Sequence, residues 1–217
     1  MRKFLLYMSC PKGQCEAELF GTNRNFDVAI NDFTESNTNP EEAEYKFSTD
    51  QWKYRHIYND LSNIVFNYEA CAMFDDDVKV STDELNKLFE IGIEHQFNIW
   101  QAALTQDSYS SWKHLYQIPN SEMRMTNTME IMMPFFSKSA LQKCWESFNI
   151  NYSAWGLDIV WAYLLNTEKL AVIDAIPVKH VRPMRGYSRI MPNGKTPGEE
   201  CSMVLQHYGI KSPPTVY

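Results

Sequence analysis

The stretch Ala70-Cys71-Ala72-Met73-Phe74-Asp75-Asp76-Asp77 decides the fold that we expect for this sequence. Its first five residues are apolar without alternation, which is typical of a strand buried on both faces of a sheet. The three acids that follow repel one another, so placing them at the end of a buried strand is costly unless a positive group lies there. The sequence therefore predicts a central strand that ends at a functional cluster of carboxylates.

Strand-like and helix-like segments alternate on both sides of this stretch. Strands are expected over Phe4–Met8, Phe26–Ile30, Asn98–Leu104 and Leu170–Ile173, with a further apolar run over Glu130–Phe136. Helices are expected after Ser48-Thr49-Asp50-Gln51 and Ser81-Thr82-Asp83-Glu84, which resemble capping boxes, after Ser137, and over Gly156–Leu165. This alternation favours an α/β fold with a mostly parallel central sheet and helices on both faces.

The chain is expected to form one domain over residues 1–181. Residues 182–217 hold five of the ten prolines, so they predict a tail packed on the domain, with a short helix near Glu199–His207. Two polar stretches, Asn31–Glu44 and Gln106–Thr126, have no clear period and predict loops.

Composition narrows the class of protein. A hydrophobic fraction of 44% in 217 residues is sufficient for a folded core, and the net charge of −7 argues against nucleic acid as a partner. The five cysteines include no Cys-x-x-Cys pair, which favours free thiols in a reducing compartment. The first ten residues have too short an apolar run for a signal peptide, and no stretch is long enough to span a membrane. We therefore expect a cytoplasmic protein without an integral membrane segment.

The aspartate cluster predicts a site for Mn²⁺ or Mg²⁺. In an extended chain Asp75 and Asp77 point to one side and Asp76 to the other, so the first two can converge on one cation. Such cations prefer oxygen ligands and complete their coordination with water and substrate phosphates. A solvated acidic turn that caps the next helix is the structural alternative.

Two other kinds of site fit the aspartate cluster less well. An EF-hand loop is excluded, because Val80 and Asn86 stand where it needs glycine and glutamate. A phosphatase of the haloacid-dehalogenase type also has two aspartates one residue apart after a strand, with the first as nucleophile. That reading, with Asp75 as nucleophile, stays open, although Lys79 replaces the usual Thr or Val and the strand is not the first.

A second constellation lies at Trp155-Gly156-Leu157-Asp158, just before the expected buried helix. An acid in the first helical turn lies beside free backbone N–H groups, where it can accept a proton from an attacking hydroxyl. The alternative is that Asp158 only stabilises the helix terminus. His180 is a candidate late metal ligand, and Arg182 and Arg185 add charge that can meet a diphosphate.

At these residues the chain resembles known families. The strand that ends in Asp-x-Asp is similar to the metal motif of GT-A-fold glycosyltransferases. More specifically, the chain resembles an uncharacterised family labelled lysine-ketoglutarate reductase trans-splicing related. The resemblance covers roughly residues 26–181 and rests on these blocks: Phe74-Asp75-Asp76-Asp77, Glu130–Ser137, Ala154-Trp155-Gly156-Leu157-Asp158, Ile173-Asp174, Val178-Lys179-His180 and Gln51-Trp52-Lys53-Tyr54.

The resemblance implies a GT-A-like fold and a metal-dependent glycosyltransferase of inverting mechanism, with Asp158 as the general base. It implies Asp75, Asp77 and His180 as metal ligands. The remaining implied contacts are Asp32, Lys53 and Asp76 to the nucleotide-sugar donor, and Glu130, Trp155 and Gly156 in the acceptor or sugar pocket. A protein that binds a nucleotide sugar or carbohydrate without turnover is the non-enzymatic alternative.

Overall fold

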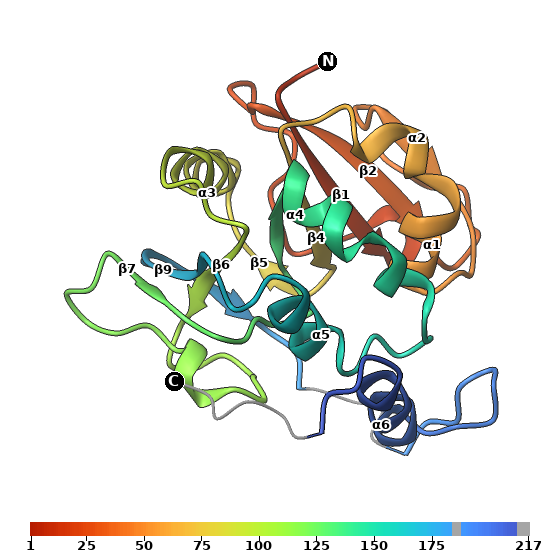
Figure 1. Ribbon diagram of the computed structural model, residues 1–217. Helices are drawn as coiled ribbons and strands as arrows, with labels where there is room; N and C mark the ends of the chain where they lie inside the picture. The colour runs from red at the N-terminus through yellow and green to blue at the C-terminus, as the bar shows by residue number, and fades with distance from the viewer. Residues whose placement is uncertain (184–187, 212–217) are drawn as a thin grey trace.

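The computed structural model describes residues 1–183 and 188–211, and within them the strands form one mixed sheet (Figure 1). The strand order is β3-β2-β1-β4-β8-β6-β9-β5, and β7 also pairs with β9. The strands are β1 (Phe4–Cys10), β2 (Phe26–Asp32), β3 (Tyr45–Phe47), β4 (Ala70–Asp75), β5 (Val78–Lys79), β6 (Ile99–Leu104), β7 (Met123–Met125), β8 (Phe135–Ser137) and β9 (Leu170–His180).

The sheet is mostly parallel, as the sequence predicts. Strands β1, β2, β3 and β4 are parallel to one another, and β6 and β9 form a second parallel pair. The short strand β8 joins these two groups by running antiparallel to both β4 and β6, which gives the two groups the same direction. The carboxyl ends of β1, β2, β4 and β9 therefore meet at one edge of the sheet, the edge at which such folds bind ligands.

Helices cover both faces of the sheet. They are α1 (Lys53–Asp60), α2 (Ser62–Val65), α3 (Thr82–Glu94), α4 (Lys138–Cys144), α5 (Leu157–Leu164) and α6 (Pro197–His207), with 3-10 turns at Pro11–Gly13, Lys113–Leu115 and Trp145–Asn149. Alternate side chains of β1 enter two separate cores, because a strand presents successive residues to opposite faces. Leu6 packs with α3, whereas Leu5 packs with α1, α4 and α5.

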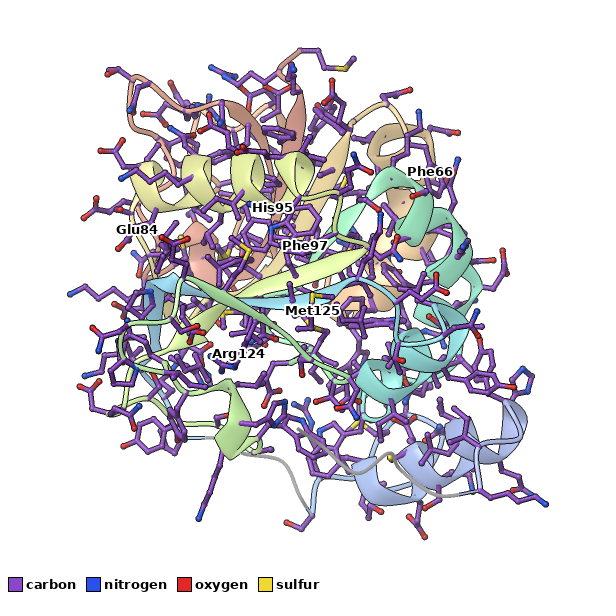
Figure 2. All side chains as sticks on the ribbon, turned by 60° about the vertical axis from the view of Figure 1, so that its left-hand side comes forward. Phe66, Glu84, His95, Phe97, Arg124 and Met125 are labelled. Atoms are coloured by element: carbon purple, nitrogen blue, oxygen red, sulfur yellow. The ribbon has the colours of Figure 1, made fainter. Side chains whose placement is uncertain are left out.

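Helix α3 has the start that its sequence predicts. The Ser81 hydroxyl accepts from the Glu84 N–H, and the Glu84 carboxylate accepts from the Ser81 N–H at 2.7 Å. Figure 2 shows Glu84 at one end of this helix and His95, its C-cap, at the other. Ser137 also caps α4 as predicted, by accepting from the Ala140 N–H.

The capping box predicted at Ser48 is wrong. Helix α1 begins at Lys53, its N-cap is Trp52, and no side chain caps it. The chain at Thr49 is instead held extended against β2, because the Asn31 side chain accepts from the Thr49 N–H and donates to the Thr49 carbonyl, both at 3.0 Å. This two-way hydrogen bond occupies the backbone groups that a helix would need.

Several predicted boundaries shift. The predicted loop over residues 31–44 begins after β2, which reaches Asp32, and the segment 106–126 contributes β7. The segment expected to end at Ile173 continues without a break to His180. This longer β9 matters for function, because it carries His180 to the ligand-binding edge of the sheet.

The C-terminal segment packs on the domain through α6, near α5 (Figure 1). Val204 is buried in the same core as α5, and the Glu200 carboxylate accepts from the backbone N–H groups of Tyr152 and Ser153. Thr196 forms a capping box with Glu199 at the start of this helix. No helix within the described ranges is long and apolar enough to cross a lipid bilayer.

Candidate active site

A cleft of about 750 Å³ opens at the carboxyl ends of the parallel strands. Its lining brings together residues from β4, β9, α5, the loops that hold Phe33, Ser111 and Glu130, and the C-terminal segment. The lining residues are Phe33, Asp75, Asp76, Asp77, Ser111, Trp112, Glu130, Ile131, Met132, Trp155, Gly156, Asp158, Ile159, His180, Arg182, Pro183, Arg189 and Cys201. Most of the predicted site residues therefore meet in one place, although Asp32 and Lys53 are not among the lining residues.

Asp75 is the last residue of β4, and Lys53 from the start of α1 lies against it. The Lys53 ammonium donates to Asp75 Oδ1 at 2.6 Å and to the Ile131 carbonyl at 2.7 Å. The Tyr54 hydroxyl donates to the same carbonyl at 2.6 Å, which fixes the beginning of α1 over the cleft. Lys53 thus supplies the positive charge that the carboxylate cluster requires.

The predicted alternation of the three aspartates is wrong after Asp75. The strand ends there, and Asp76 and Asp77 form a turn into β5, so the two-residue period of an extended chain no longer applies. As a result both carboxylates face Arg182, which forms an ion pair with Asp76 and another, at 3.1 Å, with Asp77.

His180 and Asp77 are held face to face. His180 Nε2 lies 3.2 Å from Asp77 Oδ2, and Nδ1 lies 2.7 Å from the Tyr109 carbonyl, an acceptor that fixes the proton on Nδ1. Burial opposes charge on this imidazole, but Asp77 and the Tyr109 carbonyl together raise the pKa of His180. Burial also acts on Asp77, yet His180 and Arg182 hold the pKa of Asp77 below its usual value.

This pair suits a cation. Asp77 Oδ1 is buried without a hydrogen-bond partner among the residues that the structure describes, and His180 Nε2 lies close to the other oxygen of the same carboxylate. A metal-ligating histidine typically donates its other N–H to a carbonyl, as His180 does to Tyr109. Residues 1–183 and 188–211 contain no set of three or more His, Cys, Asp or Glu side chains placed to enclose a metal by themselves. A bound cation would therefore need ligand atoms from substrate or water, which is the usual situation for Mg²⁺ at diphosphate sites.

Asp158 lines the same cleft from the first turn of α5. Gly156 caps this helix with φ +89°, a conformation that favours glycine, and a Cβ there would lie 3.1 Å from Cys201 Sγ. Burial raises the pKa of Asp158 to about 6, although backbone N–H groups of the first turn and the Trp112 side chain, which hydrogen-bonds to it, favour the carboxylate. Asp158 is thus oriented, mostly ionised at neutral pH, and able to accept a proton.

Glu130 is the second acid on this side. It is buried, its backbone N–H donates to Gln101 Oε1 at 2.7 Å, and its carboxyl group accepts from the Ser110 hydroxyl at 3.3 Å. Burial, reinforced by the charge of Asp158, raises the pKa of Glu130 to about 7. Two acids with different pKa values thus share one cleft, a common arrangement at catalytic sites.

Asp32, predicted to contact a base or ribose, organises the neighbouring loop. Its carboxylate accepts from the N–H and hydroxyl groups of Thr34 and Ser36 and from the Lys12 N–H. These contacts hold the pKa of Asp32 far below its usual value despite burial. The next residue, Phe33, is 40% exposed and lines the cleft.

Several residues at and around the cleft have no signal in the sequence. Trp112 and Ser110 lie in a polar loop without periodicity, and only the folded chain brings them to Asp158 and Glu130. Arg189 stacks over Trp52, with 4.4 Å between the guanidinium carbon and the ring centroid, and so joins the C-terminal segment to the beginning of α1. Arg185, the other predicted diphosphate contact, lies outside the described residues.

Comparisons with known proteins concern the fold. No protein-family model matches the chain, and no curated protein sequence matches it either. Among solved structures, Staphylococcus aureus TarS residues 1–349 in complex with UDP-GlcNAc aligns over 96% of this chain and 66% of its own length, with a TM-score of 0.55 and 11% identity. The same TarS fragment in complex with UDP aligns over 81% of this chain and 59% of its own, with a TM-score of 0.48.

At 11% identity the likeness to TarS concerns the fold alone, and this chain spans just under two thirds of the TarS fragment. The mostly parallel sheet with helices around it confirms the architecture expected from the sequence. The chain therefore has a GT-A-like α/β architecture, with a mostly parallel sheet between helices and a cleft at the carboxyl ends of its strands.

Proposed function

We propose that this protein transfers a sugar from a nucleoside diphosphate donor to a hydroxyl acceptor, with inversion at the sugar carbon. One observation carries the proposal: the Asp77–His180 pair and the oriented acid Asp158 line the same cleft in a GT-A-like fold. The first group suits the charged leaving group, and the second suits the attacking hydroxyl. The TarS fragment whose fold is similar is in complex with UDP-GlcNAc, which supports a nucleotide-sugar donor.

In this proposal the donor's diphosphate binds beside Arg182 and the turn that carries Asp76 and Asp77. Asp77 and His180, with Asp75 beside them, would hold Mn²⁺ or Mg²⁺, which would neutralise the charge that develops on the leaving diphosphate. Arg182 is paired with Asp76 and Asp77, but its side chain is half exposed. Its guanidinium can therefore also donate to a phosphate oxygen at the rim of the cleft. Lys53 keeps Asp75 paired and the base of the cleft fixed.

Asp158 takes the proton of the acceptor. As the acceptor oxygen bonds to the sugar carbon, the bond from that carbon to the diphosphate oxygen breaks, and the hydroxyl proton passes to the Asp158 carboxylate. The Trp112 side chain and the first N–H groups of α5 orient this carboxylate. Glu130 lies beside it, and its raised pKa keeps a large protonated fraction near pH 7 that can donate a hydrogen bond to a sugar oxygen.

Donor binding is tested first, by thermal shift with UDP, GDP, CDP and their sugars, each with and without Mn²⁺. A ligand that binds only the native state raises the apparent stability by mass action. We expect one nucleotide to give a Mn²⁺-dependent shift that is lost in Asp77→Ala and kept in Asp50→Ala, the same change at an exposed aspartate. No shift with any nucleotide would contradict the proposed donor class.

Transfer is then assayed with the donor so identified. Asp158→Asn should keep donor binding and lower the rate of transfer about 10²- to 10⁴-fold, the usual contribution of a general base. A variant with an unchanged rate would contradict the role of Asp158.

The same preparations decide between the alternatives. Release of phosphate from an aryl phosphate, abolished by Asp75→Asn, would select the phosphatase reading. Nucleotide-sugar binding without transfer or hydrolysis over a panel of acceptors would instead favour a binding protein.

A further inference from the structure

Two cysteines lie together beside the acidic turn. Cys10 is the last residue of β1 and is fully buried, whereas Cys15 is partly buried and packs against the same core. The Cys10 thiol faces the Cys15 sulfur as a hydrogen-bond donor, and the Cys15 thiol itself donates to the Ala17 carbonyl at 3.5 Å. All five cysteines fall in the described part of the chain, and all are free thiols.

A tight turn holds this pair together. Pro11–Gly13 reverses the chain, and the Gln14 N–H donates to the Pro11 carbonyl at 2.9 Å. Lys12 and Gly13 both have positive φ, 52° and 65°, and the Lys12 N–H is fixed by the Asp32 carboxylate at 2.8 Å. The turn that joins the two cysteines is therefore fixed by hydrogen bonds of its backbone.

The chain after Cys15 is hydrogen-bonded to the candidate active site. The Glu16 N–H donates to the Asp76 carbonyl at 2.8 Å, and the Glu18 N–H donates to the Val80 carbonyl at 2.9 Å. A displacement of Cys15 therefore also moves Glu16, and through its hydrogen bond the turn that carries Asp76 and Asp77.

We propose that Cys10 and Cys15 form a reversible disulfide site whose co-reactant is a low-molecular-weight disulfide, and that its oxidation moves the Asp76 turn and weakens nucleotide binding. The effect on binding rests on the proposed function, whereas the disulfide itself does not. A sulfur–sulfur bond is about 2 Å long, shorter than any hydrogen bond between thiols, so oxidation draws Cys15 and Glu16 toward β1.

The two cysteines have different parts in the exchange. The hydrogen bond from Cys10 lowers the pKa of Cys15, and the same contact together with burial raises the pKa of Cys10. The Cys15 thiolate attacks one sulfur of the small disulfide and releases one small thiolate. That thiolate takes the Cys10 proton, and the Cys10 sulfur then attacks Cys15 Sγ and releases the second small thiolate. Two protein thiols are oxidised, and one small disulfide is reduced to two thiols.

The test treats the full chain with oxidised glutathione and maps the products by mass spectrometry without reduction. Trypsin cleaves after Lys12, between the two cysteines, so the disulfide joins the peptides Phe4–Lys12 and Gly13–Arg24. We expect this linked pair in the wild-type protein and its loss on reduction. Cys10→Ala should accumulate the glutathione adduct on Cys15, and Cys15→Ser should form neither product at Cys10. Absence of the linked peptides, with Cys15 unmodified, would overturn the proposal.

Coupling to the cleft is measured separately. Oxidation should increase hydrogen exchange at the Glu16 amide at least several-fold, and Cys15→Ser should show no such change. Oxidation of the wild-type protein should also decrease the Mn²⁺-dependent thermal shift that the nucleotide causes. If no nucleotide binds even the reduced protein, the proposed function fails while the linked peptides and the exchange rate still decide on the disulfide. Linked peptides with unchanged exchange at Glu16 would overturn the coupling.

Discussion

Glu130 has a buried environment that its sequence context does not indicate. It is buried in the cleft with a carboxyl group that accepts from Ser110 and lies near the charge of Asp158. A glutamate in that position costs the folded state free energy whenever it is ionised.

The sign of the resulting pH dependence follows from the raised pKa of Glu130. Because this pKa is about 7 in the folded protein, against 4.5 for a free glutamate side chain, the folded state binds more protons between these two pH values. Stability therefore falls as the pH rises through this window. Glu130→Gln should remove the cost of ionising this buried carboxyl group. Between pH 4.5 and pH 8 the variant should therefore lose roughly 1–3 kcal/mol less free energy of unfolding than the wild type.

Urea unfolding at the two pH values measures this effect. Glu122→Gln, at an exposed glutamate, is the matched control and should leave the pH dependence unchanged. An equal pH dependence in the Glu130 variant and the wild type would show that this carboxyl group is not buried in solution.

Trp112 adjusts Asp158 through its side-chain hydrogen bond. Burial raises the pKa of Asp158, and the Trp112 contact opposes that rise. Trp112→Phe removes the donor, so we expect the acidic limb of the pH–rate profile to move to higher pH. Trp145→Phe, at a tryptophan that stacks on Tyr58 in the other half of the molecule, should not move this limb. An unshifted limb in Trp112→Phe would mean that Trp112 does not set the protonation of the base.

At the scale of elements, two serines with similar sequence contexts have different roles. Ser81 caps α3, whereas Ser48 lies in an extended segment and its hydroxyl is buried without a hydrogen-bond partner in the described residues. Ser81→Ala should lower the free energy of unfolding by about 1 kcal/mol, as loss of an N-cap usually does. Ser48→Ala should be neutral or slightly stabilising. Equal losses in chemical denaturation would contradict the placement of the start of α1.

Helix α3 also depends on a glycine in its interior. A Cβ at Gly92 would lie 1.9 Å from the ring of Trp100, a buried residue of β6. Alanine has the higher helix propensity by about 1 kcal/mol, but overpacking at such a contact costs roughly 1–3 kcal/mol or more. We therefore expect Gly92→Ala to lower the melting temperature.

Gly198→Ala in α6, where a Cβ would meet nothing within 4 Å, is the control and should not lower it. A stabilised Gly92 variant would mean that the helix and strand are farther apart than described.

At the scale of the whole molecule, Glu200 connects the C-terminal segment to the active-site side of the domain. Its carboxylate accepts from the N–H groups of Tyr152 and Ser153 and from the Asn193 side chain. Because Arg182, Arg189 and Cys201 of the same segment line the cleft, Glu200→Ala should loosen one wall of the site. Limited trypsin digestion should then cleave after Lys195 several times faster than in the wild type, and Glu199→Ala should have a smaller effect. Equal cleavage rates would contradict this tether.

The sequence by itself determined the local elements and the acids of the site. Apolar runs placed β1, β2, β4 and β6, capping residues placed the starts of α3 and α4, and the acids at the ends of such elements pointed to Asp77 and Asp158. These signals are local: periodicity and capping depend on neighbours within a few residues along the chain.

Only the tertiary structure decided which side chains meet. Asn31 kept Ser48 from capping a helix, the end of β4 turned Asp76 and Asp77 together toward Arg182, and folding brought Trp112 to Asp158. The mostly parallel sheet also buried Glu130 and placed Cys15 against Cys10. Burial and contacts between distant segments set these arrangements, and neither is encoded in the spacing of nearby residues.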